Sequence, residues 1–220
     1  MIKIKTTLNI LLLLLTTVVF SQAQLNLTKL TGSYDNGSFS EFSSSKEING
    51  TPYLFENWNN LSIITLTNGK EYKLNNINFD IKKKKFVSKI SNKKLFIFEN
   101  IKKVTIKGKK YIEVNNSFYQ KIFYKEKGLS LLKKFKLKEV KPIINKMTYQ
   151  VIKKGTYKKI EEYFVKKEDK LKEVKLKRSS ILKEFSKDLQ VKVKKFSKQE
   201  SLSFKEEGDL FKIFKYYNSL

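Results

Sequence analysis

The sequence has 220 residues and a formal net charge of +26, and it contains neither cysteine nor histidine. Without these residues the chain lacks the usual ligands of zinc, copper and iron, the commonest general base, a thiol nucleophile and any disulfide. Of the 47 basic residues only Arg178 is arginine, although proteins that read guanine and phosphate favour arginine. The composition therefore argues against metal sites, cofactors and nucleic-acid binding.

The first 23 residues have the three parts of a secretory signal. Lys3 and Lys5 precede a short apolar core, and Ser21-Gln22-Ala23 supplies small residues for cleavage. The core is shorter than the ~20 residues that a spanning helix needs, and no later stretch is apolar and long enough to span. We expect residues 1–23 to be removed. The mature protein is then exported to the periplasm or cell envelope and is peripheral rather than integral.

Residues 24–60 are predicted to be rich in loops. Gly32–Ser38 and Ser43–Ser45 are typical of turns. The segment ends in an aromatic cluster that includes Tyr53 and Trp58, and two interpretations of it are open. The cluster closes one end of a β core, or Tyr53 and Trp58 form a contact patch for a ligand or partner.

Residues 61–177 are predicted to form an antiparallel β domain. Asn68-Gly69 is a strong hairpin signal between strands at 62–67 and 71–74. Further strands are expected at 77–81, 86–90, 94–99, 104–106, 111–114, 118–124 and 129–137, with a second hairpin of 157–166 and 171–177. This spacing is typical of a meander, sandwich or barrel. One alternative function follows, in which an interior lined by Phe79, Phe96, Phe98 and Tyr111 binds an apolar ligand.

Residues 178–220 are predicted to be helical. Leu182, Phe185, Leu189, Val193 and Phe196 recur at the spacing of one helix face. Ser203 and Glu206 are spaced as a capping box before a second apolar stripe. The predicted fold class is therefore mostly β with C-terminal helices (α+β), in which two amphipathic helices follow the sheet. These helices pack on the core or, alternatively, lie on a membrane surface.

Three segments carry a resemblance. The segment Asn49–Leu54 reads Asn-Gly-Thr-Pro-Tyr-Leu, and it is followed by the hairpin segment Thr67–Tyr72 and by Asn78-Phe79-Asp80. Over most of the mature chain this pattern resembles a family of small secreted proteins of Bacteroidota, in which a Gly-Ser/Thr-Pro-Tyr-Leu motif precedes such a hairpin. Thr51 stands where serine is usual. The resemblance implies an exported location and this fold, but no catalytic residue, because the family has no assigned activity.

Two catalytic patterns in the sequence give no specific signal. Ser-x-x-Lys occurs four times, about as often as expected from the numbers of serine and lysine residues. Glu161 and Glu162 are neighbours on a predicted strand, so they point to opposite faces and cannot act as a facing pair. We therefore expect a protein that is not an enzyme.

The positive charge is concentrated after residue 80. Residues 24–80 hold 4 lysines and 6 acids, whereas residues 81–220 hold 41 basic residues and 15 acids. Codon bias of an A- and T-rich genome is one explanation, and a selected binding surface is the other. The second predicts docking to an anionic envelope surface or a protein partner. The candidate contacts are Lys133, Lys134, Lys136, Lys138, Lys192, Lys194 and Lys195. The oligomeric state is left open.

Overall fold

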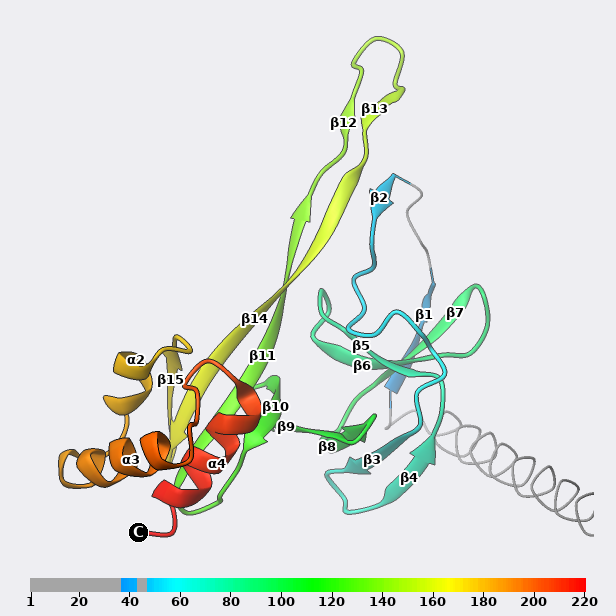
Figure 1. Ribbon diagram of the computed structural model, residues 1–220. Coiled ribbons are helices and arrows are strands. Elements are labelled where there is room, and N and C mark those ends of the chain that lie inside the picture. The colour runs from blue at the N-terminus through cyan, green and yellow to red at the C-terminus, as the bar shows by residue number, and fades with distance from the viewer. Residues whose placement is uncertain (1–36, 43–46) are drawn as a thin grey trace, which may run out of the picture. The chain divides into compact units, whose positions relative to one another are not determined.

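The computed structural model describes residues 37–42 and 47–220 (Figure 1). The predicted signal peptide 1–23, residues 24–36 of the predicted loop-rich segment and Ser43–Ser45 lie outside the described residues. The chain forms two compact units. Unit 1 comprises residues up to Lys110 together with Lys141–Gly155, and unit 2 comprises Tyr111–Val140 and Thr156–Leu220. The predicted β domain 61–177 is thus distributed over both units, and each unit is described by itself.

The predicted fold class is confirmed. Antiparallel strands occupy most of the described chain up to residue 174, and helices follow near the C-terminus. The described part contains three helices where two were expected. No helix in the described residues is both long enough and apolar enough to cross a membrane.

Unit 1 consists of short antiparallel strands. One sheet has the order β1-β7-β6-β5, and a second group pairs in the order β8-β3-β4. The bounds are β1 Gly37–Glu41, β3 Ser62–Leu66, β4 Glu71–Leu74, β5 Ile77–Asp80, β6 Lys85–Lys89, β7 Lys94–Phe98 and β8 Ile101–Ile106. The unit also contains β2 (Ile48–Asn49) and a hairpin of β12 (Ile143–Ile144) and β13 (Val151–Lys153).

The predicted Asn68-Gly69 hairpin is confirmed. β3 and β4 pair from Ser62 opposite Leu74 to Thr65 opposite Glu71. Gly69 has a φ of +84°, a conformation that glycine adopts without steric cost. The turn residues therefore set the register that the sequence predicts.

Strand β1 shows how pairing overrides a sequence that is typical of loops. It pairs with β7 from Gly37 opposite Phe98 to Glu41 opposite Lys94. At Gly37 a Cβ atom would lie 2.0 Å from the carbonyl oxygen of Ile97, so only glycine permits this approach. The predicted loop-rich segment therefore contains two strands, β1 and β2, because tertiary contacts outweigh local propensity.

Aromatic rings fill the core of unit 1. The rings of Phe96 and Phe98 have centroids 5.1 Å apart, and those of Phe79 and Phe86 are 5.0 Å apart. All four side chains are buried. Of the residues proposed to line a ligand cavity, Phe79, Phe96 and Phe98 thus contact other rings, and Tyr111 belongs to unit 2. Such edge and tilted contacts are typical of a packed interior.

Unit 2 is a sheet with a helical layer. The strands follow the order β9-β10-β11-β14-β15, and the helices α2, α3 and α4 come last in the chain. The bounds are β9 Lys109–Val114, β10 Ser117–Phe123, β11 Leu129–Val140, β14 Gly155–Lys167, β15 Lys170–Val174, α2 Arg178–Leu182, α3 Lys187–Gln199 and α4 Glu207–Tyr217. The predicted second hairpin is confirmed as β14 and β15, in which Lys167 pairs with Lys170.

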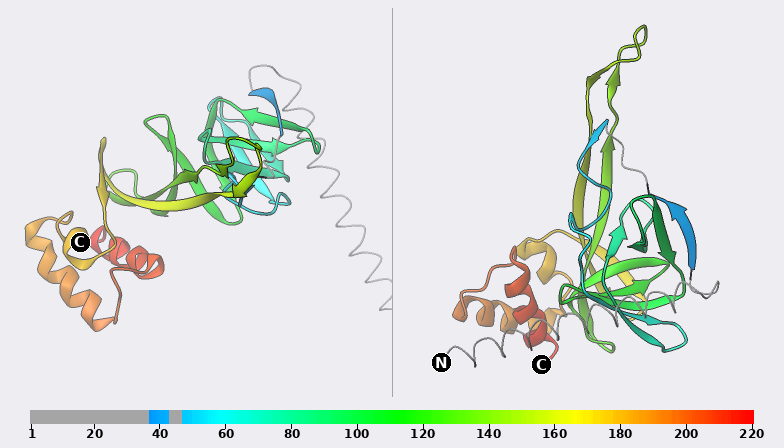
Figure 2. Two further views of the ribbon diagram at one scale, coloured as in Figure 1. Left: turned by 90° about the horizontal axis from the view of Figure 1, so that it is seen from above. Right: turned by 90° about the vertical axis from the view of Figure 1, so that its right-hand side faces the viewer.

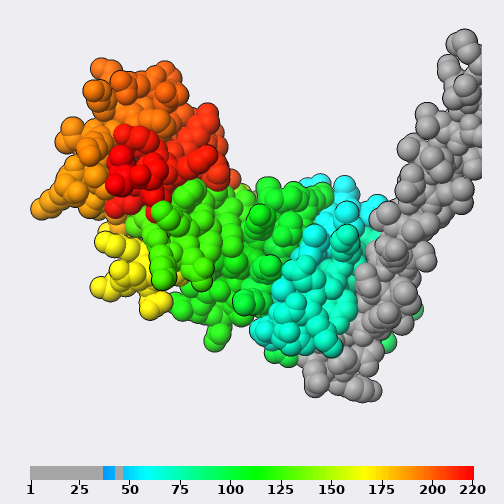
Figure 3. Space-filling view, turned by 90° about the horizontal axis from the view of Figure 1, so that it is seen from below, coloured from blue at the N-terminus to red at the C-terminus, as the bar shows by residue number. Residues whose placement is uncertain are grey.

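The three helices cover one face of this sheet. Leu131 and Val165 pack with Ile181, Val193 and other apolar side chains of the helices in one buried cluster. The helices lie together in both views of Figure 2. In Figure 3 the red surface of α4 adjoins green strand residues, in agreement with its packing on β10 and β11. The apolar stripes of the helices therefore pack in the core, which is the first of the two interpretations above.

Two details of the helix prediction are wrong. α2 ends at Leu182 and α3 begins at Lys187, so the first apolar stripe is not one continuous helix. Phe185 lies in the connection but is buried with both helices, which explains the uninterrupted spacing. The capping box also fails. α4 begins at Glu207 without a side-chain cap, and the Ser203 amide donates to Asp209 Oδ2 at 2.9 Å.

Candidate docking surface and buried lysine network

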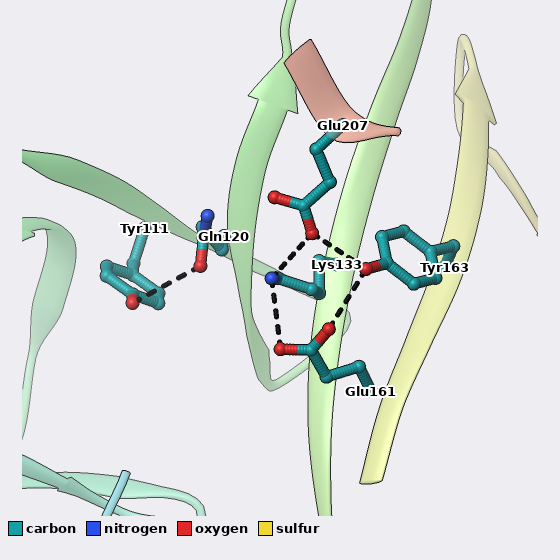
Figure 4. A network of polar contacts seen from close by, with 6 residues as sticks. All are labelled: Tyr111, Gln120, Lys133, Glu161, Tyr163 and Glu207. Atoms are coloured by element: carbon teal, nitrogen blue, oxygen red, sulfur yellow. Dashed lines mark hydrogen bonds and ion pairs between the residues drawn. The ribbon is translucent and has the colours of Figure 1, made fainter. Parts of the chain in front are cut away.

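One of the predicted surface lysines is buried in unit 2. Lys133 on β11 is only 4% exposed. Its ammonium lies 3.1 Å from Glu161 Oε1 on β14 and 2.6 Å from Glu207 Oε1 at the start of α4 (Figure 4). A buried ammonium requires such partners, because desolvation otherwise disfavours its charge. Lys133 is therefore a structural residue, and its prediction as a docking contact is wrong.

Tyrosine hydroxyls complete this buried lysine network. The Tyr163 hydroxyl lies 3.0 Å from Glu161 Oε2 and 2.7 Å from Glu207 Oε1, so the two carboxylates share its single proton. Burial, together with the hydrogen bonds to both carboxylates, raises the pKa of Tyr163 well above its usual range. Nearby, Tyr111 OH lies 3.5 Å from Gln120 Oε1, and burial likewise raises the pKa of Tyr111 (Figure 4). Both phenols stay protonated at neutral pH and act as donors.

The sequence contained one signal for this network. Leu129, Leu131, Lys133 and Phe135 alternate along β11 and therefore share one face of the sheet. That face is apolar, so a lysine on it predicts a buried ion pair. The sequence does not show which strands pair or where α4 packs. The residues around Lys133 could therefore not be predicted; they are Glu161, Tyr163, Gln120 and Glu207.

The other candidate lysines of β11 lie in different surroundings. Lys134 is half-buried, and its Nζ is 3.4 Å from Ser117 Oγ and 5.4 Å from the ring centroid of Tyr119. Lys136 is exposed and lies 2.6 Å from Glu162 Oε1, an interaction that raises the pKa of Lys136. Lys138 is exposed and pairs across the ladder with Lys158. Of these three lysines, Lys138 is the one that lies directly opposite another lysine in the ladder.

The three candidate lysines of α3 all face solvent. Lys192, Lys194 and Lys195 are exposed, and none of them is in an ion pair with any residue that the structure describes. Lys187 and Lys198 are exposed on the same helix, on which Asp188 is the single acid. Buried Val193 and Ser197 fix this helix on the core, so the lysines point to solvent.

A shallow groove of about 600 Å³ adjoins this helix. The described residues that line it include three cations and no acid; they are Arg178, Ser179, Leu182, Lys183, Gln190 and Lys194. The groove therefore includes the single arginine of the chain. We call Arg178, Lys183, Lys192, Lys194 and Lys195 the α2–α3 basic surface.

Tyr53 and Trp58 belong to the core of unit 1. The two ring centroids are 4.7 Å apart, and each ring also contacts Phe42. Tyr53 is buried with Val87 and Leu95, and Trp58 is half-buried against them. The geometry favours the first interpretation, in which this cluster closes the core. A patch that rests on Tyr53 and Trp58 stays a prediction, and Tyr53 offers little surface to a ligand.

Asp80 is a buried acid beside this cluster, and its backbone is bridged to Tyr53. Burial raises the pKa of Asp80, although the Lys83 amide donates to its Oδ1 at 2.9 Å. The native state then holds this proton to a higher pH than the unfolded state does. The free energy of unfolding therefore falls as the pH rises from the pKa of Asp80 in the unfolded state to its higher pKa in the folded state.

We expect Asp80→Asn, which keeps an oxygen acceptor for Lys83, to gain stability relative to the wild type as the pH rises from acid to neutral. Urea unfolding of both proteins across this range measures the difference. Asp169→Asn at the exposed β14–β15 turn controls for loss of one negative surface charge. A stability of Asp80→Asn relative to wild type that stays constant or falls with rising pH would contradict the assignment.

Two of the catalytic patterns considered in the sequence are not brought together in the parts of the chain that the structure describes. Within residues 37–42 and 47–220, no three acidic side chains are grouped so that they could hold a metal ion. The Ser130/Lys133 pair of the Ser-x-x-Lys motif is split between the two faces of β11, and Ser130 Oγ bonds to the backbone of Lys125. Glu161 and Glu162 likewise contact lysines on opposite faces of the ladder.

The fold and the α2–α3 basic surface define an α+β protein with an exposed cationic helix. No family model, no curated protein and no solved structure matches this chain.

Proposed function

We propose that this chain is an exported, non-catalytic protein of the cell envelope that docks to an anionic envelope surface. The observation that supports this most directly is the α2–α3 basic surface, where exposed lysines adjoin a groove lined by cations. The export signal at residues 1–23 supports the location. The surface attracts anions without needing a deep pocket, because attraction between exposed charges acts over roughly a Debye length, ~8 Å at physiological salt.

The charge distribution indicates that the whole of residues 81–220 attracts anionic surfaces. Residues 81–220 carry 41 basic residues against 15 acids. Such a field concentrates anionic surfaces near the protein and accelerates encounter at low salt. On α3 the buried helix face holds the backbone, so these lysines project to solvent from a fixed helix. Their charges are available to an anionic surface, whereas the charge of Lys133 is already paired.

Reversal of three lysines tests this function. We expect Lys192→Glu/Lys194→Glu/Lys195→Glu to lose about 100-fold or more of the affinity for phosphatidylglycerol vesicles at low salt, at roughly 1 kcal/mol per basic residue near an anionic membrane. Sedimentation of the mature chain with these vesicles, over a range of salt concentrations, gives the affinity. Wild-type binding should weaken steeply as salt rises.

The matched control carries the same change in net charge in unit 1. Lys70, Lys109 and Lys110 are exposed, and Lys70→Glu/Lys109→Glu/Lys110→Glu should retain most of the vesicle affinity. An equal loss in both variants would mean that overall charge, and not the α2–α3 basic surface, governs binding. Wild-type binding that is insensitive to salt would contradict electrostatic docking.

A further inference from the structure

A second surface lies on the hairpin of β12 and β13 in unit 1. We call residues 141–155 the tip hairpin; Figure 1 labels its two strands. Its ladder is short and irregular, with Ile143 opposite Lys153 and Ile144 opposite Val151. A two-stranded hairpin without a packed face is only marginally stable in water, so its apolar side chains gain little by burial within it.

The tip hairpin exposes six large apolar side chains. Met147 is 91% exposed, Tyr149 is 82% exposed and Ile152 is 68% exposed. The others are Ile143, Ile144 and Val151. Single exposed apolar residues are common on protein surfaces, but six of them within one hairpin of about fifteen residues indicate a surface for interaction.

The turn of the tip hairpin is ordered by specific hydrogen bonds. Asn145 Oδ1 accepts from the amides of Met147 at 2.9 Å and Thr148 at 3.2 Å. The Asn145 carbonyl accepts from the Tyr149 amide at 2.8 Å, and the Asn145 amide donates to the Gln150 carbonyl at 2.9 Å. Tyr149 adopts a φ of +56°, which is uncommon for this residue. The turn therefore presents Met147 and Tyr149 in a defined geometry.

The positive charge of the tip hairpin indicates what kind of partner it binds. Residues 140–160 contain six lysines and no acid. Four of them, Lys141, Lys146, Lys153 and Lys154, lie within the tip hairpin and are exposed. Pairing of two tip hairpins would bring these like charges together, which disfavours a second copy of the chain. Apolar and tyrosine side chains interleaved with lysines match the interface of an anionic bilayer, where apolar groups enter the acyl region and ammonium groups reach the headgroups.

We propose that the tip hairpin inserts Met147, Tyr149 and Ile152 into the interface of an anionic lipid bilayer. This inference rests on the proposed function for its location at an anionic envelope surface, and it names the bilayer as that surface. The α2–α3 basic surface supplies salt-sensitive attraction. The tip hairpin adds apolar insertion, which salt does not screen.

Insertion is measured with tryptophan reporters in the full mature chain. Tyr149→Trp should be quenched by phosphatidylglycerol vesicles that carry bromine on the acyl chains. Val191→Trp places the reporter at an exposed position of α3 and should not be quenched. The wild type gives the background signal of Trp58. Met147→Asp/Ile152→Asp should lose about tenfold or more of the vesicle affinity that remains at high salt, because each replaced side chain loses its apolar burial. Neutral phosphatidylcholine vesicles should bind more weakly.

The outcomes separate the two proposals. An unquenched Tyr149→Trp on vesicles that still bind through α3 would overturn insertion and leave electrostatic docking intact. Quenching that survives reversal of Lys192, Lys194 and Lys195 with unchanged affinity would support insertion and overturn docking through α3. If the aspartate variant binds vesicles as wild type does but loses capture of a purified envelope protein, the tip hairpin binds protein and the bilayer proposal fails.

Discussion

Lys133→Ala is expected to lower the free energy of unfolding by about 2–4 kcal/mol, toward the lower end of the range for breaking a buried ion pair. The ammonium contacts Glu161 and Glu207, which also share the hydroxyl of Tyr163. Without Lys133 these two carboxylates keep a common donor but lose the charge that neutralises them. Both carboxylates are partly exposed, so water offsets part of the loss. Urea unfolding followed by circular dichroism measures the change.

Lys136→Ala is the matched control for this prediction. Lys136 lies on the same strand and pairs with Glu162, but its side chain is 58% exposed. Exposed pairs contribute little, so a much smaller change is expected. A double-mutant cycle with Glu207→Ala should give a coupling with Lys133 that is clearly different from zero. Equal effects of Lys133→Ala and Lys136→Ala would refute the structural role of the buried lysine network.

Phe214→Ala is expected to cost about 3–5 kcal/mol, the range for truncation of a buried phenylalanine. Its side chain is fully buried, with ring centroids 5.3 Å from Phe185 and 6.2 Å from Phe123. It thus joins α4 to the α2–α3 connection and to β10. Phe211 on the same helix also contacts Phe123, but it is 45% exposed. Phe211→Ala should therefore cost much less, and thermal unfolding of both variants makes the comparison.

Local signals explain which parts of the fold could be predicted. Alternation of apolar residues and the Asn68-Gly69 turn identified most strands of residues 61–177, because both act within a few residues. Four asparagines adopt positive φ values at or next to turns, namely Asn76, Asn100, Asn115 and Asn116. Asparagine tolerates this conformation better than most residues. Abundant asparagine therefore has a structural use here, whatever the codon bias that accompanies it.

Features that depend on distant partners could not be predicted. The break between Leu182 and Lys187 is hidden, because Phe185 in the connection packs in the same cluster as the helices. The burial of Lys133 depends on Glu207, which is brought to β11 only by the packing of α4. The exposure of Met147 and Tyr149 depends on the absence of packing against their hairpin in the described chain. An apolar residue in the sequence does not say whether a neighbour will cover it.

The long strands β11 and β14 could in principle pair in more than one register. Twelve positions pair without interruption, and a slip of two residues would keep every side chain on its own face of the sheet. The repeated lysines of both strands make such slipped alignments chemically similar. Lys133 disfavours one of these slips, which would place it opposite buried Val165 instead of Tyr163. A lysine whose removal destabilises the sheet can thus also disfavour a wrong alignment of its strands.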